Sequence, residues 1–224
     1  MSFKTIQLVL PDVLICLNGI LPDVSVLEKF ATVPIIAADG AVTQLQEKGI
    51  IPRLIIGDLD SIAHNLSYWK NRTDIEIVHM SDQNSTDFEK VLEYVHQKGY
   101  LSPLICGLHG GELDHTLNNW SILMRYSKRM PLAVYDQGKT AIPIYESIYL
   151  ETQPMEMISL IPQPTVHLTT DGLEWNLQNE ELRLGTREGA RNRAVKRHIT
   201  LEIHSGSLLL FHNAHLPYIP QILG

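Results

Sequence analysis

The sequence predicts an α/β N-terminal domain with a mostly parallel sheet, followed by an all-β C-terminal sandwich domain. Short runs of Val, Ile and Leu alternate with helical patterns up to residue 137, as they do in parallel α/β sheets. Beyond residue 138 the segments are short, β-branched and often alternating, and their turns carry Pro, Gly and Asp. We therefore place an α/β domain at 1–137 and a β-sandwich domain at 138–224.

Six apolar runs predict the strands of the first domain. Because the runs are continuous rather than alternating, both faces of each strand should be buried. They are VLICLN, VPIIAAD, RLIIGD, IEIVHM, PLICG and PLAVYD, at residues 13–18, 33–39, 53–58, 75–80, 103–107 and 131–136. Apolar residues spaced i, i+3, i+4 and i+7 predict amphipathic helices over 86–99 and 113–124.

Six further segments predict the antiparallel strands of the second domain. They are TAIPIYESIYLET, MEMISLIP, VHLTT, LRLGT, HITLEIHSG and SLLLFH, at residues 140–152, 155–162, 166–170, 182–186, 198–206 and 207–212. Their lengths and turn residues favour a sandwich over further α/β units.

Composition narrows the class of function. A net charge of −7 offers no basic surface for nucleic acid or an anionic membrane. No apolar run reaches the roughly 18 residues of a membrane span, and the N-terminal segment lacks a signal-peptide pattern, so we expect a cytoplasmic protein. The two cysteines, Cys16 and Cys106, lie in apolar runs and are expected to be buried thiols.

Aspartates follow four successive predicted strands, where open α/β sheets bind their ligands. They are Asp39; Asp58 and Asp60; Asp82 and Asp87; and Asp114. Each one alone is equally compatible with a turn or a helix cap. Together they favour a cation, because clustered carboxylates repel one another unless a cation holds them. Asp58 and Asp60 lie two apart on a segment expected to be extended, so both should point to one side and share a Mg²⁺ ion with phosphate oxygens.

Other nucleotide and metal motifs are weak or absent. Gly110 and Gly111 stand between a strand and a helix, where the backbone could approach a phosphate, but the GxGxxG spacing is missing. The Gly138–Thr140 segment imitates the end of a P-loop, yet the first glycine and the following helix are lacking. The ten histidines show none of the usual zinc-site spacings, so we favour surface or site-lining histidines.

Three blocks resemble thiamin pyrophosphokinase: AADGAVTQLQEKGIIPRLIIGDLDSI, DQNSTDFEKVL and GGELDHTLNNWSIL. Within them, GDLDS, TDFEK and GGxxDHxxxN occur together in the order and spacing of that family, and GLEWNLQNEELRLGT resembles its β domain. The resemblance implies attack of the thiamin hydroxyl on the β-phosphorus of ATP, with thiamin diphosphate and AMP as products. It also implies a homodimer with active sites between subunits.

The resemblance assigns roles to individual positions. It implies Asp58, Asp60 and Asp87 as Mg²⁺ and phosphate residues, with Asp114 completing the catalytic set; Asp60 and Asp114 both stay open as the base. The implied nucleotide and substrate contacts are Gln83, Thr86, His115, Asn119 and Asn192. Asp39, Gly110 and Gly111 join these contacts because of their place at the strand ends.

Two departures from the family pattern concern charge. Glu112 stands where the family usually has an arginine, so a cation is lost. Gly189–Asn192 replaces a Ser-x-Ser-Asn segment, which places Arg191 and Arg193 where small hydroxyl side chains are expected beside thiamin. The arginines either turn outward, or toward the ATP phosphates to replace the lost cation, or the acceptor is another alcohol. A catalytically weak thiamin- or nucleotide-binding relative is the remaining alternative.

Overall fold

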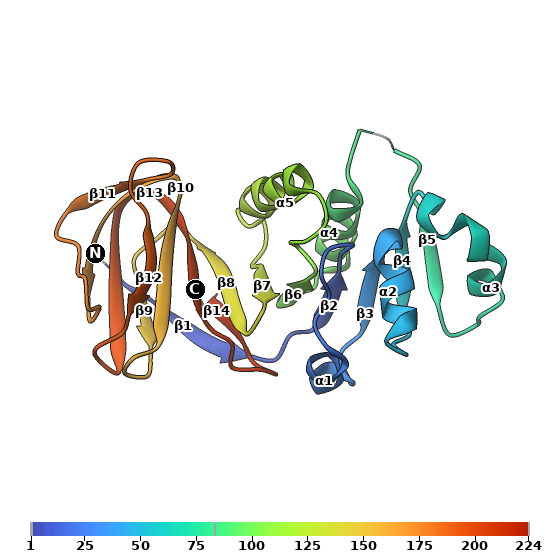
Figure 1. The fold of residues 1–224 in the computed structure, drawn as a ribbon, viewed down its shortest axis with the longest axis horizontal. Coiled ribbons are helices and arrows are strands. Elements are labelled where there is room, and N and C mark those ends of the chain that lie inside the picture. Colours follow the sequence, from blue (N-terminus) through green and yellow to red (C-terminus); the bar gives the residue numbers. More distant parts are fainter. Residues whose placement is uncertain (1, 83, 224) are drawn as a thin grey trace. The chain divides into compact units, whose positions relative to one another are not determined.

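The computed structural model describes residues 2–82 and 84–223 (Figure 1). The chain forms two compact units: Leu10–Gln137, and the chain up to Val9 together with the chain from Gly138 onward. The range 1–137 predicted for the first domain therefore differs from the structure at its start. The reason is that strand β1 (Lys4–Val9) pairs with β14 (Ile219–Leu223) and β9 (Ile148–Glu151), which belong to the second unit. No helix among the described residues is long and apolar enough to cross a membrane.

The first unit is built on a parallel sheet, as the sequence predicts. Its strands run in the order β7-β6-β2-β3-β4-β5, and each neighbouring pair is parallel. These strands are β2 (Val13–Cys16), β3 (Ile35–Ala38), β4 (Leu54–Gly57), β5 (Glu76–His79), β6 (Pro103–Cys106) and β7 (Ala133–Asp136). Every residue of β2, β4 and β6 is buried, which confirms the interpretation of the continuous apolar runs for these strands. The prediction is wrong for β5, which has no buried residue because it lies at the edge of the sheet.

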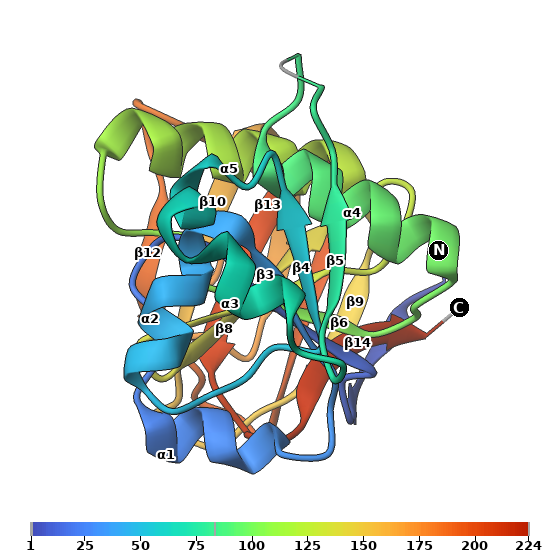
Figure 2. The same cartoon turned by 90° about the vertical axis from the view of Figure 1, so that its right-hand side faces the viewer.

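Helices cover both faces of this sheet. Helix α2 (Val42–Glu47) and helix α4 (Asp87–Lys98) lie on opposite sides of the strands (Figure 2). Helices α4 and α5 (Leu113–Tyr126) correspond to the two predicted helices. The sequence patterns did not predict the shorter elements α1 (Val24–Leu27), η1 (Glu28–Phe30), η2 (Asp39–Ala41), α2, η3 (Asp60–Asn65) and α3 (Leu66–Lys70).

The strand order creates a switch point at the end of β2. The chain proceeds outward from β2 through β3 and β4 to β5, and then returns to place β6 on the other side of β2. The chain after β2 leads to β3, whereas the chain after its neighbour β6 leads to β7 in the opposite direction. Such a divergence opens a crevice beyond the carboxyl ends of the two strands, which is the usual ligand position in open α/β sheets. Both cysteines lie in these central strands as buried, free thiols, as predicted.

The second unit is β-rich, as predicted, and two long strands organise it. Strand β10 (Met157–Asp171) pairs with β13 (His198–Asn213) along most of its length, with register shifts near Pro162 and His167. Strand β13 also pairs with β9 through its first half and with β8 (Lys139–Ile144) through its second. The strands β11 (Glu180–Arg183) and β12 (Gly189–Arg193) pair with β10. The predicted strands 155–162 and 166–170 are therefore one strand, β10, and the predicted strands 198–206 and 207–212 are one strand, β13. The predicted breaks between them are irregularities within these strands.

Candidate active site

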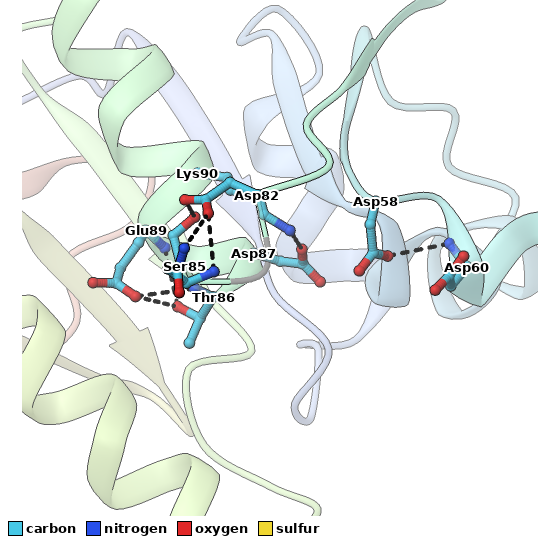
Figure 3. A network of polar contacts seen from close by, with 9 residues as sticks. Asp58, Asp60, Asp82, Ser85, Thr86, Asp87, Glu89 and Lys90 are labelled. Atoms are coloured by element: carbon cyan, nitrogen blue, oxygen red, sulfur yellow. Dashed lines mark hydrogen bonds and ion pairs between the residues drawn. The ribbon is translucent and has the colours of Figure 1, made fainter.

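Three aspartates converge beyond the strand ends of the α/β unit. Asp39 follows β3, Asp58 follows β4, and Asp87 begins helix α4. One carboxylate oxygen of each lies within 4.8 Å of the others. Figure 3 shows the Asp58 and Asp87 side chains directed toward the same space. The sequence predicts this cluster in part. It places Asp58 and Asp87 at the ion, but it also assigns Asp60 to the ion and assigns Asp39 to nucleotide contact.

Asp39 is the buried member of the cluster. Its side chain is 1% exposed, and neither carboxylate oxygen has a hydrogen-bond partner among the described residues. Burial, followed by the neighbouring charges of Asp87 and Asp58, raises the pKa of Asp39 to about 6. A buried carboxylate without a partner costs free energy, and a bound cation would remove that cost. The oxygen-only donor set and its partial exposure fit Mg²⁺.

Two glycines make room for this arrangement. A Cβ atom on Gly57 would stand 2.7 Å from the Asp39 Cγ, and one on Gly40 would stand 2.8 Å from the Asn18 side chain. Larger residues at either position would displace these polar side chains. The Asp39-Gly40 and Gly57-Asp58 pairs in the sequence therefore reflect close packing around the acidic cluster.

Helix α4 supplies Asp87 together with a neighbouring cation. Thr86 caps the helix, because its hydroxyl accepts from the Glu89 N–H at 3.3 Å while the Glu89 carboxylate accepts from the Thr86 N–H at 3.0 Å. Lys90, one turn further on and only 4% exposed, donates to Asp87 Oδ1 at 3.0 Å. The sequence patterns did not single out Lys90, since a lysine in an amphipathic helix is normally solvated. Its only signal is the i, i+3 spacing from Asp87.

Asp60 lies outside the three-carboxylate cluster, which corrects the predicted geometry. The segment after β4 is not extended: Leu59 is left-handed with φ 68°, and Asp60 begins the helical turn η3. The Asp60 N–H donates to Asp58 Oδ1 at 3.2 Å. Asp58 and Asp60 do share the lining of a cavity of about 520 Å³. Asp60 is thus a neighbour of the cluster through Asp58 rather than a member of it.

A cavity of about 410 Å³ lies at the switch point and opens onto the cluster. It gathers side chains that are scattered along the sequence. They are Leu17, Asn18, Ala38, Gly40, Asp58, Ser61, Ser85, Thr86, Asp87, Phe88, Lys90, His115, Asn118 and Asn119. The structure therefore brings together Thr86, His115 and Asn119 as the sequence predicted. The Asn119 amide also donates to the Leu108 carbonyl at 3.0 Å, which ties helix α5 to the loop after β6.

Asp114 is separate from this cavity. It lies exposed in the first turn of α5, where its Oδ1 accepts the N–H of His115 at 2.9 Å, and it clusters with Glu112 and His115. It is not among the residues that line the cavity, whereas His115 is. The predicted convergence of four strand ends is thus correct for three of them.

The glycine loop after β6 has mixed roles. Gly110, with φ 113°, packs closely on Ile20, because a Cβ atom there would stand 2.7 Å from the Ile20 N. Gly111, with φ 72°, has open space around its Cα. Of these two glycines, Gly111 alone therefore leaves room for a ligand on that side. The predicted contact Gln83 lies outside the described residues.

The predicted contact Asn192 belongs to the second unit, where its side chain bonds the backbone of its neighbours. Asn192 is 6% exposed; its Oδ1 accepts from the N–H groups of Trp175 and Arg193, and its amide donates to the Trp175 carbonyl at 2.8 Å. This contact fixes the backbone of Trp175, whose side chain is 58% exposed. Arg191 and Arg193 are both exposed, and Arg193 Nε lies 4.0 Å from a carboxylate oxygen of Glu174.

Comparison with known protein families identifies the family to which the chain belongs. Residues 29–134 match the sequence model of "Thiamin pyrophosphokinase, catalytic domain", and residues 146–208 match "Thiamin pyrophosphokinase, vitamin B1 binding domain". The two matches together cover most of the chain. The chain belongs to the thiamin pyrophosphokinase family. Within the family match, the catalytic part contains the whole acidic cluster, and the vitamin B1 part contains Trp175 and Asn192.

Individual relatives agree with this assignment. Thiamine pyrophosphokinase 1 of Arabidopsis thaliana is 31% identical over 70% of this chain and 64% of its own length. Thiamine pyrophosphokinase of Bacillus subtilis is 26% identical over 78% of this chain and 85% of its own. The chain spans only 64% of the length of the two Arabidopsis relatives that it matches.

A solved structure shares the fold. The crystal structure of thiamine pyrophosphokinase from Bacillus subtilis superposes with a TM-score of 0.74 at 22% identity, covering 91% of this chain and all of that one. The likeness confirms an α/β part followed by a β-rich part.

Proposed function

We propose that this member of the thiamin pyrophosphokinase family transfers the pyrophosphoryl group of ATP to the hydroxyl of thiamin, giving thiamin diphosphate and AMP. The observation that carries the proposal is the unpartnered, buried carboxylate of Asp39, which lies within 4.8 Å of Asp58 and Asp87, two residues that line the switch-point cavity. Transfer of this kind depends on positioning and charge neutralisation more than on covalent chemistry.

Asp39, Asp58 and Asp87 would hold Mg²⁺, which when bound would neutralise charge on the ATP phosphates. This chain's own residues then position the reactants. Lys90 orients Asp87 through their 3.0 Å contact and contributes a positive charge beside the phosphate region. His115 and Asn119 line the same cavity and supply hydrogen-bond donors to the nucleotide.

Attack by the acceptor requires removal of its hydroxyl proton. Asp60 and Asp114 are the two candidates from the sequence, and we assign the role to Asp60. Asp60 lies beside Asp58, to whose Oδ1 its N–H donates at 3.2 Å, and the two line one cavity. Neither Asp60 nor Asp114 lines the switch-point cavity, but Asp60 is bonded to Asp58, which does, whereas Asp114 clusters with Glu112 and His115 on the surface. The expected consequence is that Asp60→Asn lowers kcat, whereas Asp114→Asn acts mainly on nucleotide binding.

The vitamin B1 part offers a surface for the acceptor. The exposed indole of Trp175, whose backbone is fixed by Asn192, presents an aromatic face to which a thiazolium cation is attracted. We infer that Asn192 acts through Trp175 rather than by touching thiamin, because its side chain is buried and bonds both the N–H and the carbonyl of Trp175.

Formation of AMP tests the proposal directly. Purified protein with ATP and Mg²⁺ is incubated with thiamin, without an acceptor, and with other primary alcohols. The proposal requires thiamin-dependent AMP in equal amount to thiamin diphosphate. If AMP forms only with another alcohol, that alcohol rather than thiamin is the acceptor. If no acceptor leads to AMP, the protein binds its ligands without catalysing the transfer.

One observation favours a second candidate, a pyrophosphokinase for another acceptor alcohol. Arg191 and Arg193 stand exposed on β12, where the family pattern has small hydroxyl side chains. Because like charges repel, an acceptor that is neutral or anionic would suit these arginines better than a thiazolium. The acceptor panel above separates the two functions.

A cytoplasmic location and a homodimer are further proposals, which rest on the sequence and the family resemblance. A dimer would allow the catalytic part of one subunit to face the vitamin B1 part of another. Light scattering at working concentration tests it, because a fully active monomer would exclude a shared active site.

A further inference from the structure

A second group of potential metal ligands lies in the β-rich unit. Glu156 directly precedes β10, His212 lies near the end of β13, and His215 lies in the turn that leads to β14. The Glu156 and His212 side chains are each 2% exposed, whereas His215 is 39% exposed. One potential ligand atom from each lies within 4.8 Å of the others. The group is therefore buried on one side and reaches solvent through His215.

The distances in this group differ from those of hydrogen bonds. Glu156 Oε1 lies 3.7 Å from His212 Nδ1 and 3.6 Å from His215 Nε2. Both exceed the usual N–H···O range of about 2.7–3.2 Å. They approach the spacing of about 3.4 Å between two ligands of a tetrahedral ion with bonds of about 2.0–2.1 Å. The two imidazole rings stack 6.0 Å apart at 29°, and one nitrogen of each lies near the same carboxylate oxygen, Glu156 Oε1.

Outer contacts hold the two buried ligands in place. His212 Nε2 lies 3.1 Å from the hydroxyl of Thr140, which is fully buried. A proton on Nε2, donated to that hydroxyl, leaves the Nδ1 lone pair directed at the group. Glu156 Oε2 accepts the Gln153 N–H at 2.9 Å, which fixes the carboxylate plane. Partners of this kind commonly orient the ligands of metal sites.

We propose that Glu156, His212 and His215 bind a zinc-type divalent transition-metal ion, with a fourth position open to solvent. Two imidazoles and one carboxylate suit Zn²⁺ or Co²⁺, whereas the aspartate cluster offers only the oxygen ligands that Mg²⁺ prefers. Nothing in the family comparison assigns such a site, and the vitamin B1 match ends at residue 208, before both histidines.

The ion would fasten the turn after β13 to the start of β10. Two backbone contacts already constrain that turn: the Ala214 N–H donates to the Gly138 carbonyl, and the Tyr218 N–H donates to the His215 carbonyl. A metal bound only in the folded state raises stability in proportion to the logarithm of its concentration relative to Kd. The site should therefore act on stability of the β-rich unit. The sequence does not show it, because Glu156 is distant from His212 and only folding brings them together.

Cobalt binding tests the proposal on the full chain. Protein freed of metal with a chelator is titrated with Co²⁺ in excess Mg²⁺, which occupies the aspartate cluster, and visible absorption is recorded. The variants are His215→Ala, an exposed ligand whose loss should not prevent folding, and Glu156→Gln. Two controls are used: His198→Ala, an exposed histidine of β13 outside the group, and Asp58→Asn, which alters the aspartate cluster.

The wild-type protein and both controls should bind Co²⁺ with the visible bands of a four-coordinate nitrogen and oxygen site, and Zn²⁺ should displace it. His215→Ala and Glu156→Gln should each lose at least about 10-fold in affinity. Zn²⁺ should raise the melting temperature of the wild type and of His198→Ala, but not of His215→Ala. The proposal is overturned if the wild type gives no such bands, if His215→Ala binds equally well, or if only Asp58→Asn loses binding.

Discussion

Gly57 and Asp39 lie so close together that a Cβ atom on Gly57 would stand 2.7 Å from the Asp39 Cγ. The contact makes the position of Asp39 dependent on a residue without a side chain. Gly57→Ala should displace the Asp39 carboxylate and lower kcat/KM about 10- to 100-fold, because small displacements at a reaction centre are costly. The Mg²⁺ concentration that gives half-maximal activity should rise as well, and a titration of activity with Mg²⁺ measures it. Normal turnover in Gly57→Ala would show that the position of Asp39 is unimportant.

Asp39→Asn should separate stability from activity. The pKa of Asp39 is raised from 3.8 to about 6, so the folded state holds a proton that the unfolded state has released. In metal-free protein, stability should therefore fall as pH rises from 3.8 to about 6. Asp39→Asn should remove this pH dependence and stabilise the metal-free protein by about 1–2 kcal/mol at neutral pH. Melting curves with a chelator measure both effects.

The same variant should be nearly inactive, and Mg²⁺ should protect it less from unfolding than it protects the wild type. If metal-free Asp39→Asn instead melts at a lower temperature than the metal-free wild type at neutral pH, the Asp39 carboxylate is stabilised by a contact other than a cation.

Asp58→Asn and Asp87→Asn should each reduce turnover by at least about 100-fold with little change in melting temperature. Asp74→Asn is the matched control, because Asp74 lies before β5, away from the cluster, and pairs with Arg72 at 2.6 Å on the surface. That exposed pair contributes little to stability because solvent screens it, so the control should stay folded and active. Equal losses in all three variants would contradict the placement of the site at the strand ends.

Lys90→Met should raise the KM for ATP about 10-fold, since a buried positive charge beside the phosphate region is removed. Mg²⁺ affinity should not weaken, because the lysine no longer competes for Asp87. Lys98→Met, on the same helix but near Tyr94 at its far end, serves as the control. Loss of Mg²⁺ affinity without a change in ATP affinity would assign Lys90 a purely structural role.

Arg191→Ser should raise the KM for ATP more than the KM for thiamin, if the exposed guanidinium replaces the family arginine that Glu112 has displaced. Repulsion between like charges at about 4 Å in a site of intermediate dielectric reaches a few kcal/mol, so an arginine directed at thiamin would be evident. Steady-state kinetics with each substrate varied measure both constants. A gain in thiamin affinity with unchanged ATP affinity would instead favour an acceptor other than thiamin.

The patterns in the sequence predicted the elements that are buried on both faces. The runs at β2, β4 and β6 were clear because a short, continuous apolar segment beside turn residues is typical of a strand covered on both sides. Strand β1 was missed, since its pairing with β14 joins residues at opposite ends of the sequence and leaves no local signal. Two long strands were predicted as pairs of short ones, because proline and glycine within β10 and β13 resemble turns.

The sequence predicts the position of a site residue correctly where that residue directly follows a strand or begins a helix. Asp58 and Asp87 follow or begin regular elements, so their convergence could be inferred. Asp60 was misplaced because the left-handed conformation of Leu59 has no signature in a leucine. The burial of Asp39 and Lys90 depends on packing between elements, which no single-segment pattern contains.

The pairing of β1 with β14 also orders events during synthesis of the chain. Everything in the sheet of the α/β unit lies between Leu10 and Gln137, so this unit can complete its hydrogen bonding while later residues are still being translated. Strand β1, which precedes the α/β unit in the sequence, must wait for β9 and then for β14 before both of its edges are paired. In nascent chains, the α/β unit should therefore become resistant to protease well before the β-rich unit does. Until β9 and β14 are made, the unpaired edges of β1 could pair with other chains, so a chaperone would be needed there.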